Sequence, residues 1–128
     1  MTAAVDISFW SNKRVFITGH TGFKGSWLSF WLQSLGAQVR GFSLQPPTSP
    51  SMFDELDIAS GMESEIGDIR DPQAIAAAMT EFNPEILIHM AAQPLVIESY
   101  HTPVETFKTN IIGTINILEI ARQIDTIK

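Results

Sequence analysis

Three glycines spaced three residues apart, Gly19, Gly22 and Gly25, constrain this chain more than any other feature. They directly follow the apolar run 14–18, which predicts a short buried strand, and they lead into a helical pattern over 25–35. Glycines at such a turn allow a sharp reversal and let the backbone approach an anion. In this context they predict a dinucleotide-binding turn. Gly19 makes the turn, Gly22 lies against a pyrophosphate, and Gly25 lets the helix pack on the sheet.

The rest of the chain alternates short apolar runs with helical patterns, which is typical of a parallel sheet with crossover helices. Further strands are predicted over 38–44, 63–66 and 86–90, and further helices over 72–82 and 104–123. We therefore predict an α/β fold, namely the first half of a Rossmann-like doubly wound parallel sheet with about four strands. Residues 1–13 are expected to be an N-terminal extension packing on the domain. Residues 14–128 are expected to be the N-terminal part of an NAD-binding Rossmann domain, without its catalytic and substrate portions.

Two packing predictions accompany this reading. In the last helix the side chains expected to share one face are Phe107, Ile111, Leu118 and Ala121. The three tryptophans, at positions 10, 27 and 31, are expected to pack in the core.

Composition excludes several classes of function. The 128 residues hold fourteen acidic and eight basic side chains, and the net charge of −6 argues against a nucleic-acid partner. The absence of cysteine excludes disulfides, iron–sulfur clusters and thiol catalysis. No apolar run is long enough to cross a bilayer and no secretory signal is evident, so we expect a soluble, cytoplasmic protein without a membrane partner. The acidic residues show no metal-ligand spacing, so no metal site is predicted.

Four segments carry a resemblance to a known family. The stretch 18–28 (TGHTGFKGSWL) resembles the extended branch of the short-chain dehydrogenase/reductase superfamily, and 67–71 (GDIRD), 89–93 (HMAAQ) and 110–114 (NIIGT) match that branch in order. Within the branch, the stretches 20–27, 43–48 and 91–96 resemble the CDP-glucose 4,6-dehydratases. The resemblance covers nearly the whole chain from residue 9 onward.

The resemblance implies NAD as the cofactor. It implies that the pyrophosphate is surrounded by Gly19, Gly22, Phe23, Lys24 and Gly25. The resemblance also implies that Asp68 accepts a hydrogen bond from the adenine amino group, with the Ile69 backbone beside it; alternatively, Asp68 caps a turn. The ribose and nicotinamide side is lined by Ala91, Ala92 and Gln93. Asn110 lies near the cofactor or bonds a neighbouring loop, and Lys24 is alternatively a solvated side chain.

The residues themselves leave the choice between NAD and NADP open. A carboxylate that binds the adenosine ribose is expected about twenty residues beyond the glycine turn. The segment 41–45 holds no acid there, and Ser43 is the hydroxyl able to substitute for it. NAD is therefore expected from the family and not from this position.

The implied reaction is the NAD-dependent dehydration of CDP-glucose to CDP-4-keto-6-deoxyglucose, by a lyase that forms a homo-oligomer. The superfamily uses a Tyr-x-x-x-Lys pair, whereas the only tyrosine, Tyr100, is followed four residues later by Val104. We therefore identify no catalytic residue, and we expect these 128 residues to bind the cofactor without turnover. The alternatives are another nucleotide-sugar epimerase or dehydratase, and a non-catalytic binding module that pairs through the strand at 86–90. His89 is expected to be a hydrogen-bonded core residue, whereas His20 either touches phosphate or supports its loop.

Overall fold

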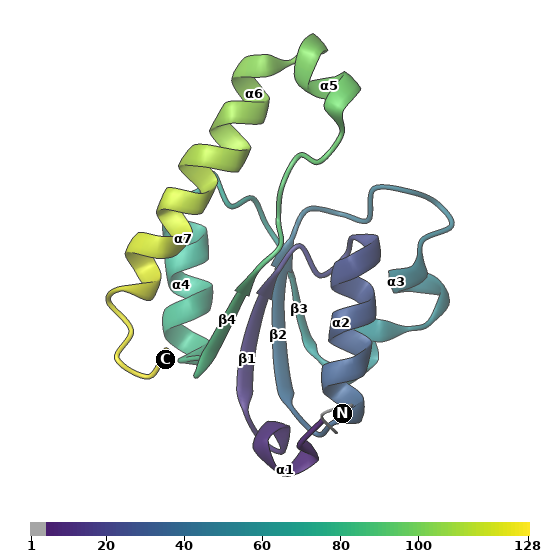
Figure 1. Cartoon of the computed structure of the whole chain (residues 1–128), viewed down its shortest axis with the longest axis vertical. Helices are drawn as coiled ribbons and strands as arrows, with labels where there is room; N and C mark the ends of the chain where they lie inside the picture. Colours follow the sequence, from purple (N-terminus) through teal and green to yellow (C-terminus); the bar gives the residue numbers. More distant parts are fainter. Residues whose placement is uncertain (1–4) are drawn as a thin grey trace.

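The computed structural model describes residues 5–128 and contains one parallel sheet with helices on both faces (Figure 1). The strand order is β3-β2-β1-β4, with all three pairings parallel. The strands are β1 (Arg14–Thr18), β2 (Gln38–Ser43), β3 (Glu63–Ile66) and β4 (Ile86–His89). This order is that of half a doubly wound sheet, so the predicted fold class and the four strands are confirmed.

Helical segments precede, connect and follow these strands. They are α1 (Ile7–Trp10), α2 (Phe23–Ser34), α3 (Met52–Glu55), the 3₁₀ turn η1 (Ile58–Gly61), α4 (Pro72–Phe82), α5 (Val96–His101), α6 (Pro103–Phe107), the π-helical turn η2 (Lys108–Gly113) and α7 (Thr114–Ala121). The crossover from β1 to β2 contains α2, and the crossover from β3 to β4 contains α4 (Figure 1).

Local sequence accounts for where the crossover helices begin and end. The Asp71 carboxylate accepts hydrogen bonds from the backbone N–H groups of Gln73 and Ala74, and Pro72 occupies the first position of α4. Beyond α2, Gly36 adopts a left-handed conformation (φ 81°), and Asn83 does the same after α4 (φ 51°). These signals were readable in the sequence, and the predicted bounds of α4 are confirmed.

Two apolar clusters lie on opposite faces of the sheet. Phe16 and Phe42 pack with Ile75, Met79 and Ile117 on the face covered by α4 and α7. On the other face, which α2 covers, the buried members are Val15, Ile17, Leu32 and Val39. Because neighbouring residues of β1 point to opposite faces, both clusters depend on this central strand.

The predicted final helix is wrong in two respects. It is divided into α6, η2 and α7, and it is preceded by α5, which the sequence pattern did not reveal. Its expected apolar face is largely exposed, with Phe107 at 63% and Leu118 at 62%, whereas Ile117 is fully buried. The π-helical turn changes the number of residues per turn and rotates the face that follows it, so that Ile117 and not Leu118 faces the core.

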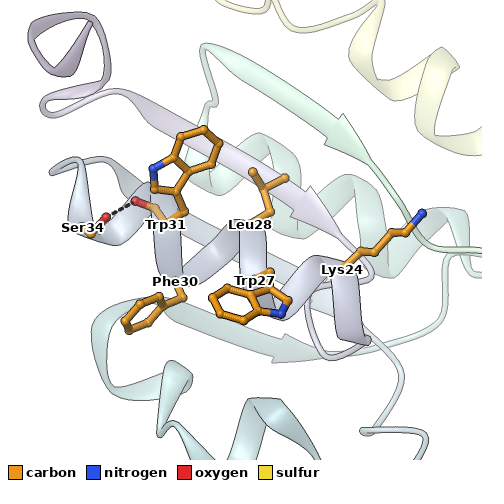
Figure 2. Close-up of a pocket in the computed structure, with 6 residues that line it drawn as sticks. All are labelled: Lys24, Trp27, Leu28, Phe30, Trp31 and Ser34. Atoms are coloured by element: carbon orange, nitrogen blue, oxygen red, sulfur yellow. Dashed lines mark hydrogen bonds between the residues drawn. The ribbon is translucent and has the colours of Figure 1, made fainter. Parts of the chain in front are cut away.

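The tryptophan prediction is also wrong for two of the three residues. Trp10 packs against the cluster under α2, but Trp27 and Trp31 are 53% and 50% exposed. With Phe30 they line a shallow pocket of about 420 Å³ on the outer side of α2 (Figure 2). Helix α2 therefore carries apolar side chains on more than its sheet-facing side, and a periodicity argument cannot distinguish those sides.

The segment before β1 is described from residue 5. Trp10 in α1 packs on the domain, and the Asn12 N–H donates to the Gly36 carbonyl at 2.8 Å. Residues 1–4 of the predicted extension lie outside the described residues, and the division between residues 13 and 14 stays a prediction. In the described part of the chain, no helix has both the length and the apolar character needed to cross a membrane.

Candidate cofactor-binding site

The carboxyl ends of three strands meet at one edge of the sheet. Thr18, the last residue of β1, is level with Phe42 of β2 and with His89 of β4. The loops that follow these strands therefore start side by side, as they do at the ligand crevice of doubly wound sheets. This register brings together the glycine loop, Ser43 and the segment 91–93, which the sequence only suggested separately.

Two of the three loop glycines are required by the packing of the chain itself. Gly19 has a φ of 80°, and a Cβ there would lie 2.8 Å from the Ala91 nitrogen. A Cβ at Gly25 would overlap the Gly19 carbonyl oxygen. Gly22 differs, because its φ is −74° and a Cβ would meet only the Gly19 carbonyl oxygen, at an ordinary 3.5 Å. The space in front of Gly22 is therefore open, and chain packing does not explain a glycine there.

Helix α2 begins at this open space without a side-chain cap. Gly22 is its N-cap residue, no side chain accepts from its first amides, and its first turn holds no acidic residue. By contrast, Asp6, Ser51 and Asp71 cap α1, α3 and α4, and the uncapped helices α5 and α6 carry Glu98 and Glu105 in their first turns. Uncapped N-terminal amides and the helix dipole favour an anion at this position. The exposed side chain of Lys24 in the first turn adds a positive charge (Figure 2).

The side chains at the carboxyl end of β2 are uncharged and carry hydroxyl groups. The Thr21 hydroxyl donates to the Leu44 carbonyl at 2.8 Å and lies 2.8 Å from Ser43 Oγ. Since the Thr21 proton is used, the Ser43 hydroxyl donates to Thr21, and Ser43 Oγ keeps free acceptor positions. The nearby cation, Arg40, is 13% exposed and pairs with Glu63, Glu65 and Glu81 at 3.3, 2.8 and 2.8 Å.

Asp68 lies after β3 and forms a close pair with Arg70. Its two oxygens accept from the Arg70 backbone N–H and guanidinium at 2.6–3.0 Å, which holds the pKa of the Asp68 carboxyl below its ordinary value. Arg70 also pairs with Glu105 of α6 at 2.5 Å. The neighbouring Ile69 is buried, and its carbonyl accepts from Asn116. An adenine contact by Asp68 stays a prediction and requires Arg70 to share these oxygens.

Asn110 holds the loop that follows β4. Its Oδ1 accepts from the Gln93 N–H at 2.8 Å, and its Nδ2 donates to the Gln93 carbonyl at 3.1 Å. The π-helical turn carries Asn110, and beside it Gly113 packs so closely that a Cβ would lie 2.5 Å from Ile69 Cδ1. Of the two roles considered for Asn110, the loop contact is present. The cofactor contacts expected of Ala91, Ala92 and Gln93 stay predictions.

His20, within the glycine loop, contacts β3 and α3 through Ser64 and Phe53. Its ring is fully buried, its Nε2 lies 2.7 Å from Ser64 Oγ, and it makes an edge contact with Phe53 at 5.2 Å between ring centroids. Burial lowers the pKa of His20 to about 4, so the ring is neutral at physiological pH.

Sequence reasoning missed the threonines that connect these loops. The Thr18 hydroxyl bonds His89, and the Thr21 hydroxyl bonds Ser43. The Thr114 hydroxyl donates to the Asn110 carbonyl. Thr18 and Thr21 stand at the end of a strand and within the glycine motif, so their position was the signal that could have drawn attention to them. In residues 5–128, no group of three or more His, Asp and Glu side chains is arranged to hold a metal ion.

Comparison with known proteins identifies the family. Residues 16–128 match the family model described as GDP-mannose 4,6 dehydratase. The chain belongs to this family. It is 54% identical over 124 residues to the CDP-glucose 4,6-dehydratase of Salmonella typhimurium, an alignment that covers 97% of this chain and 34% of that protein. The resemblance drawn from the four sequence segments is thereby confirmed.

Solved structures of related enzymes share the fold. The UDP-glucose 4-epimerase of Thermus thermophilus, solved in complex with NAD, matches with a TM-score of 0.77 and 31% identity. That alignment covers 88% of this chain and 35% of the epimerase. An epimerase of Methanothermobacter thermautotrophicus matches with a TM-score of 0.79 and 27% identity, over 93% of this chain and 34% of that one. The chain thus spans about a third of the length of these relatives.

Proposed function

We propose that these residues form the NAD-binding part of a nucleotide-sugar 4,6-dehydratase. The observation that carries the proposal is the open space in front of Gly22, at the uncapped N-terminus of α2. A glycine that the chain does not need for its own packing, facing free amides, is explained by the close approach of a pyrophosphate. Similarity to a 4,6-dehydratase and to an epimerase solved with NAD supports the same cofactor.

We assign the following roles along the cofactor as part of this proposal. The α2 amides at Phe23, Lys24 and Gly25 bind the pyrophosphate, and the Lys24 ammonium adds to the attraction. Ser43 Oγ accepts from a ribose hydroxyl, because its lone pairs remain free. Asp68 and the Ile69 backbone serve the adenine end, and the segment 91–93, held by Asn110, serves the nicotinamide end. When bound, NAD supplies a hydride acceptor and donor for the sugar.

The finer parts of the proposal follow from similarity. The 54% identity to a CDP-glucose 4,6-dehydratase favours CDP-glucose as the sugar nucleotide and a lyase reaction that releases water. We also propose a homo-oligomeric, cytoplasmic enzyme. Because the 128 residues hold no Tyr-x-x-x-Lys pair, the isolated chain is proposed to bind NAD without converting CDP-glucose.

The test is calorimetric titration of the 128-residue chain with NAD, comparing wild type with Gly22→Ala. The added methyl group has room in the free chain, so the free energy of unfolding should fall by less than about 1 kcal/mol, the loss expected at a helix N-cap. NAD affinity should fall at least about tenfold, because the methyl group occupies the space of the pyrophosphate. Gly25→Ala is the matched contrast, since its overlap with the Gly19 carbonyl should lower stability and binding together.

Two results contradict the proposal. The first is a wild-type chain that is folded but does not bind NAD. The second is a Gly22→Ala chain with unchanged NAD affinity, which would place the pyrophosphate elsewhere. Conversion of CDP-glucose by the pure chain would refute only the statement about turnover.

A further inference from the structure

His89 joins three elements at the edge of the proposed site. It is the last residue of β4, and its Nδ1 lies 2.6 Å from Oγ1 of Thr18 at the end of β1. Its Nε2 lies 3.0 Å from Oγ1 of Thr114, the first residue of α7. Neither ring nitrogen bonds a charged side chain in the described part of the chain, and burial lowers the pKa of His89.

The hydrogen-bond directions around His89 follow from counting protons. The Thr18 hydroxyl oxygen accepts from the Ala91 N–H at 3.1 Å and from the Met90 N–H at 3.0 Å, a donor that it shares with the Thr18 carbonyl oxygen at 3.1 Å. A hydroxyl has two lone pairs and one proton, so the Thr18 proton is donated to His89 Nδ1. Nδ1 is therefore the acceptor, and the neutral ring carries its proton on Nε2.

The other side of the ring agrees with this assignment. The Nε2–H of His89 donates to Thr114 Oγ1, whose own proton is donated to the Asn110 carbonyl at 2.7 Å. A continuous chain of donors thus runs from Thr18 through His89 and Thr114 to the π-helical turn. A ring protonated on Nδ1 would bring a third donor to Thr18 Oγ1 and would leave the Thr18 hydroxyl proton without its acceptor.

This chain of hydrogen bonds fixes the distance between two loops. Thr18 directly precedes Gly19, and its hydroxyl accepts from the Ala91 N–H. Gly19 packs against that same nitrogen, because a Cβ added at Gly19 would lie 2.8 Å from it. Asn110, at the far end of this series of hydrogen bonds, bonds both the N–H and the carbonyl of Gln93. The glycine loop serves the pyrophosphate in the proposed function, and the segment 91–93 serves the nicotinamide half.

We propose that His89 is a positioning residue, which as the neutral Nε2–H tautomer locks the loop after β4 to the glycine loop and so sets the affinity for the nicotinamide half of NAD. This inference rests on the proposed function. It predicts that loss of His89 weakens NAD, which spans both loops, much more than ADP, which lacks the nicotinamide half.

The first experiment compares NAD and ADP affinities of wild type and three variants of the 128-residue chain by calorimetry. His89→Leu, which retains bulk but no hydrogen bond, should weaken NAD at least about tenfold and ADP by less than about twofold. His89→Asn places an acceptor near the Nδ1 position and should recover most of the NAD affinity. His101→Leu removes an exposed histidine on α5 and should change neither affinity.

The second experiment reads the tautomer directly in the wild-type chain without ligand. Long-range ¹H–¹⁵N correlation spectra should show that Nε2 of His89 carries the proton and that Nδ1 is unprotonated. A proton on Nδ1 overturns the proposal, whether or not the variants fold.

The calorimetric outcomes separate the two hypotheses. Equal losses of NAD and ADP affinity in a folded His89→Leu chain, or no loss of NAD affinity, refute the proposal for His89 but leave the proposed function intact. A wild-type chain that binds neither NAD nor ADP refutes the proposed function, and with it the cofactor role of His89.

Discussion

Replacing the buried histidine of the glycine loop is expected to remove a large part of the pH dependence of stability. The His20 ring is fully buried against Ser64 and Phe53, and a Cβ at Gly41 would overlap it. Burial lowers the pKa of His20 from its ordinary 6.5 to about 4. Between these values the unfolded chain binds a proton that the folded chain does not, so the free energy of unfolding falls as the pH falls through this window.

The size of this effect follows from the two pKa values. Each pH unit between them is worth ~1.4 kcal/mol, so protonation lowers the free energy of unfolding by at most about 3 kcal/mol, and by about 2 kcal/mol between pH 7.5 and 5. His89 adds a contribution of the same sign, because burial lowers its pKa as well. Carboxylates with lowered pKa values, such as Asp68 and Glu119, lose their contribution only at more acidic pH, below about 4.5.

The assay is urea unfolding of wild type and His20→Gln at pH 7.5 and pH 5. The glutamine keeps a polar group near Ser64 but cannot titrate, so the stability difference between the two pH values should shrink by about 2 kcal/mol, whatever the absolute stability of the variant. His101→Gln, an exposed position, should leave the difference as in wild type. An identical pH difference in wild type and His20→Gln would refute the reasoning, because it would mean that His20 titrates normally in the folded chain.

Two further substitutions address the ion cluster on β2 and the loop after β4. In urea unfolding, Arg40→Gln should lower the free energy of unfolding by about 1–2 kcal/mol, because three carboxylates then face one another. High salt should restore part of this loss by screening their repulsion. An unchanged unfolding midpoint at low salt would argue against a stabilising ion cluster. The same variant should not alter the ratio of NAD to NADP affinity, since Arg40 is already paired. Asn110→Ala should lower the free energy of unfolding by about 1–3 kcal/mol and speed amide exchange at Gln93, and unchanged exchange there would contradict the two hydrogen bonds between Asn110 and the Gln93 backbone.

Much of the candidate site was predictable because its signals are local. The glycine spacing after an apolar run marks the turn, and each glycine can be assessed from the backbone conformation that it permits. The motif gave each glycine a separate role, but only the structure shows that Gly19 and Gly25, unlike Gly22, are required by the packing of the chain itself. That distinction depends on Ala91 and on the carbonyl of residue 19, which approach only after β4 pairs with β1.

The sequence by itself determined the strands, the glycine loop and the start of α4 at Asp71, because these depend on periodicity and on turn chemistry within a few residues. Tertiary structure alone decided the π-helical turn, the exposure of Trp27 and Trp31, and the hydrogen-bond partners of His89. The hydrogen-bond partners of His89, Thr114 and Thr18, are 25 and 71 residues away, and parallel strands bring such partners together only through long crossovers. Local sequence thus specifies which loop can face an anion, and the register of the sheet specifies what holds that loop in place.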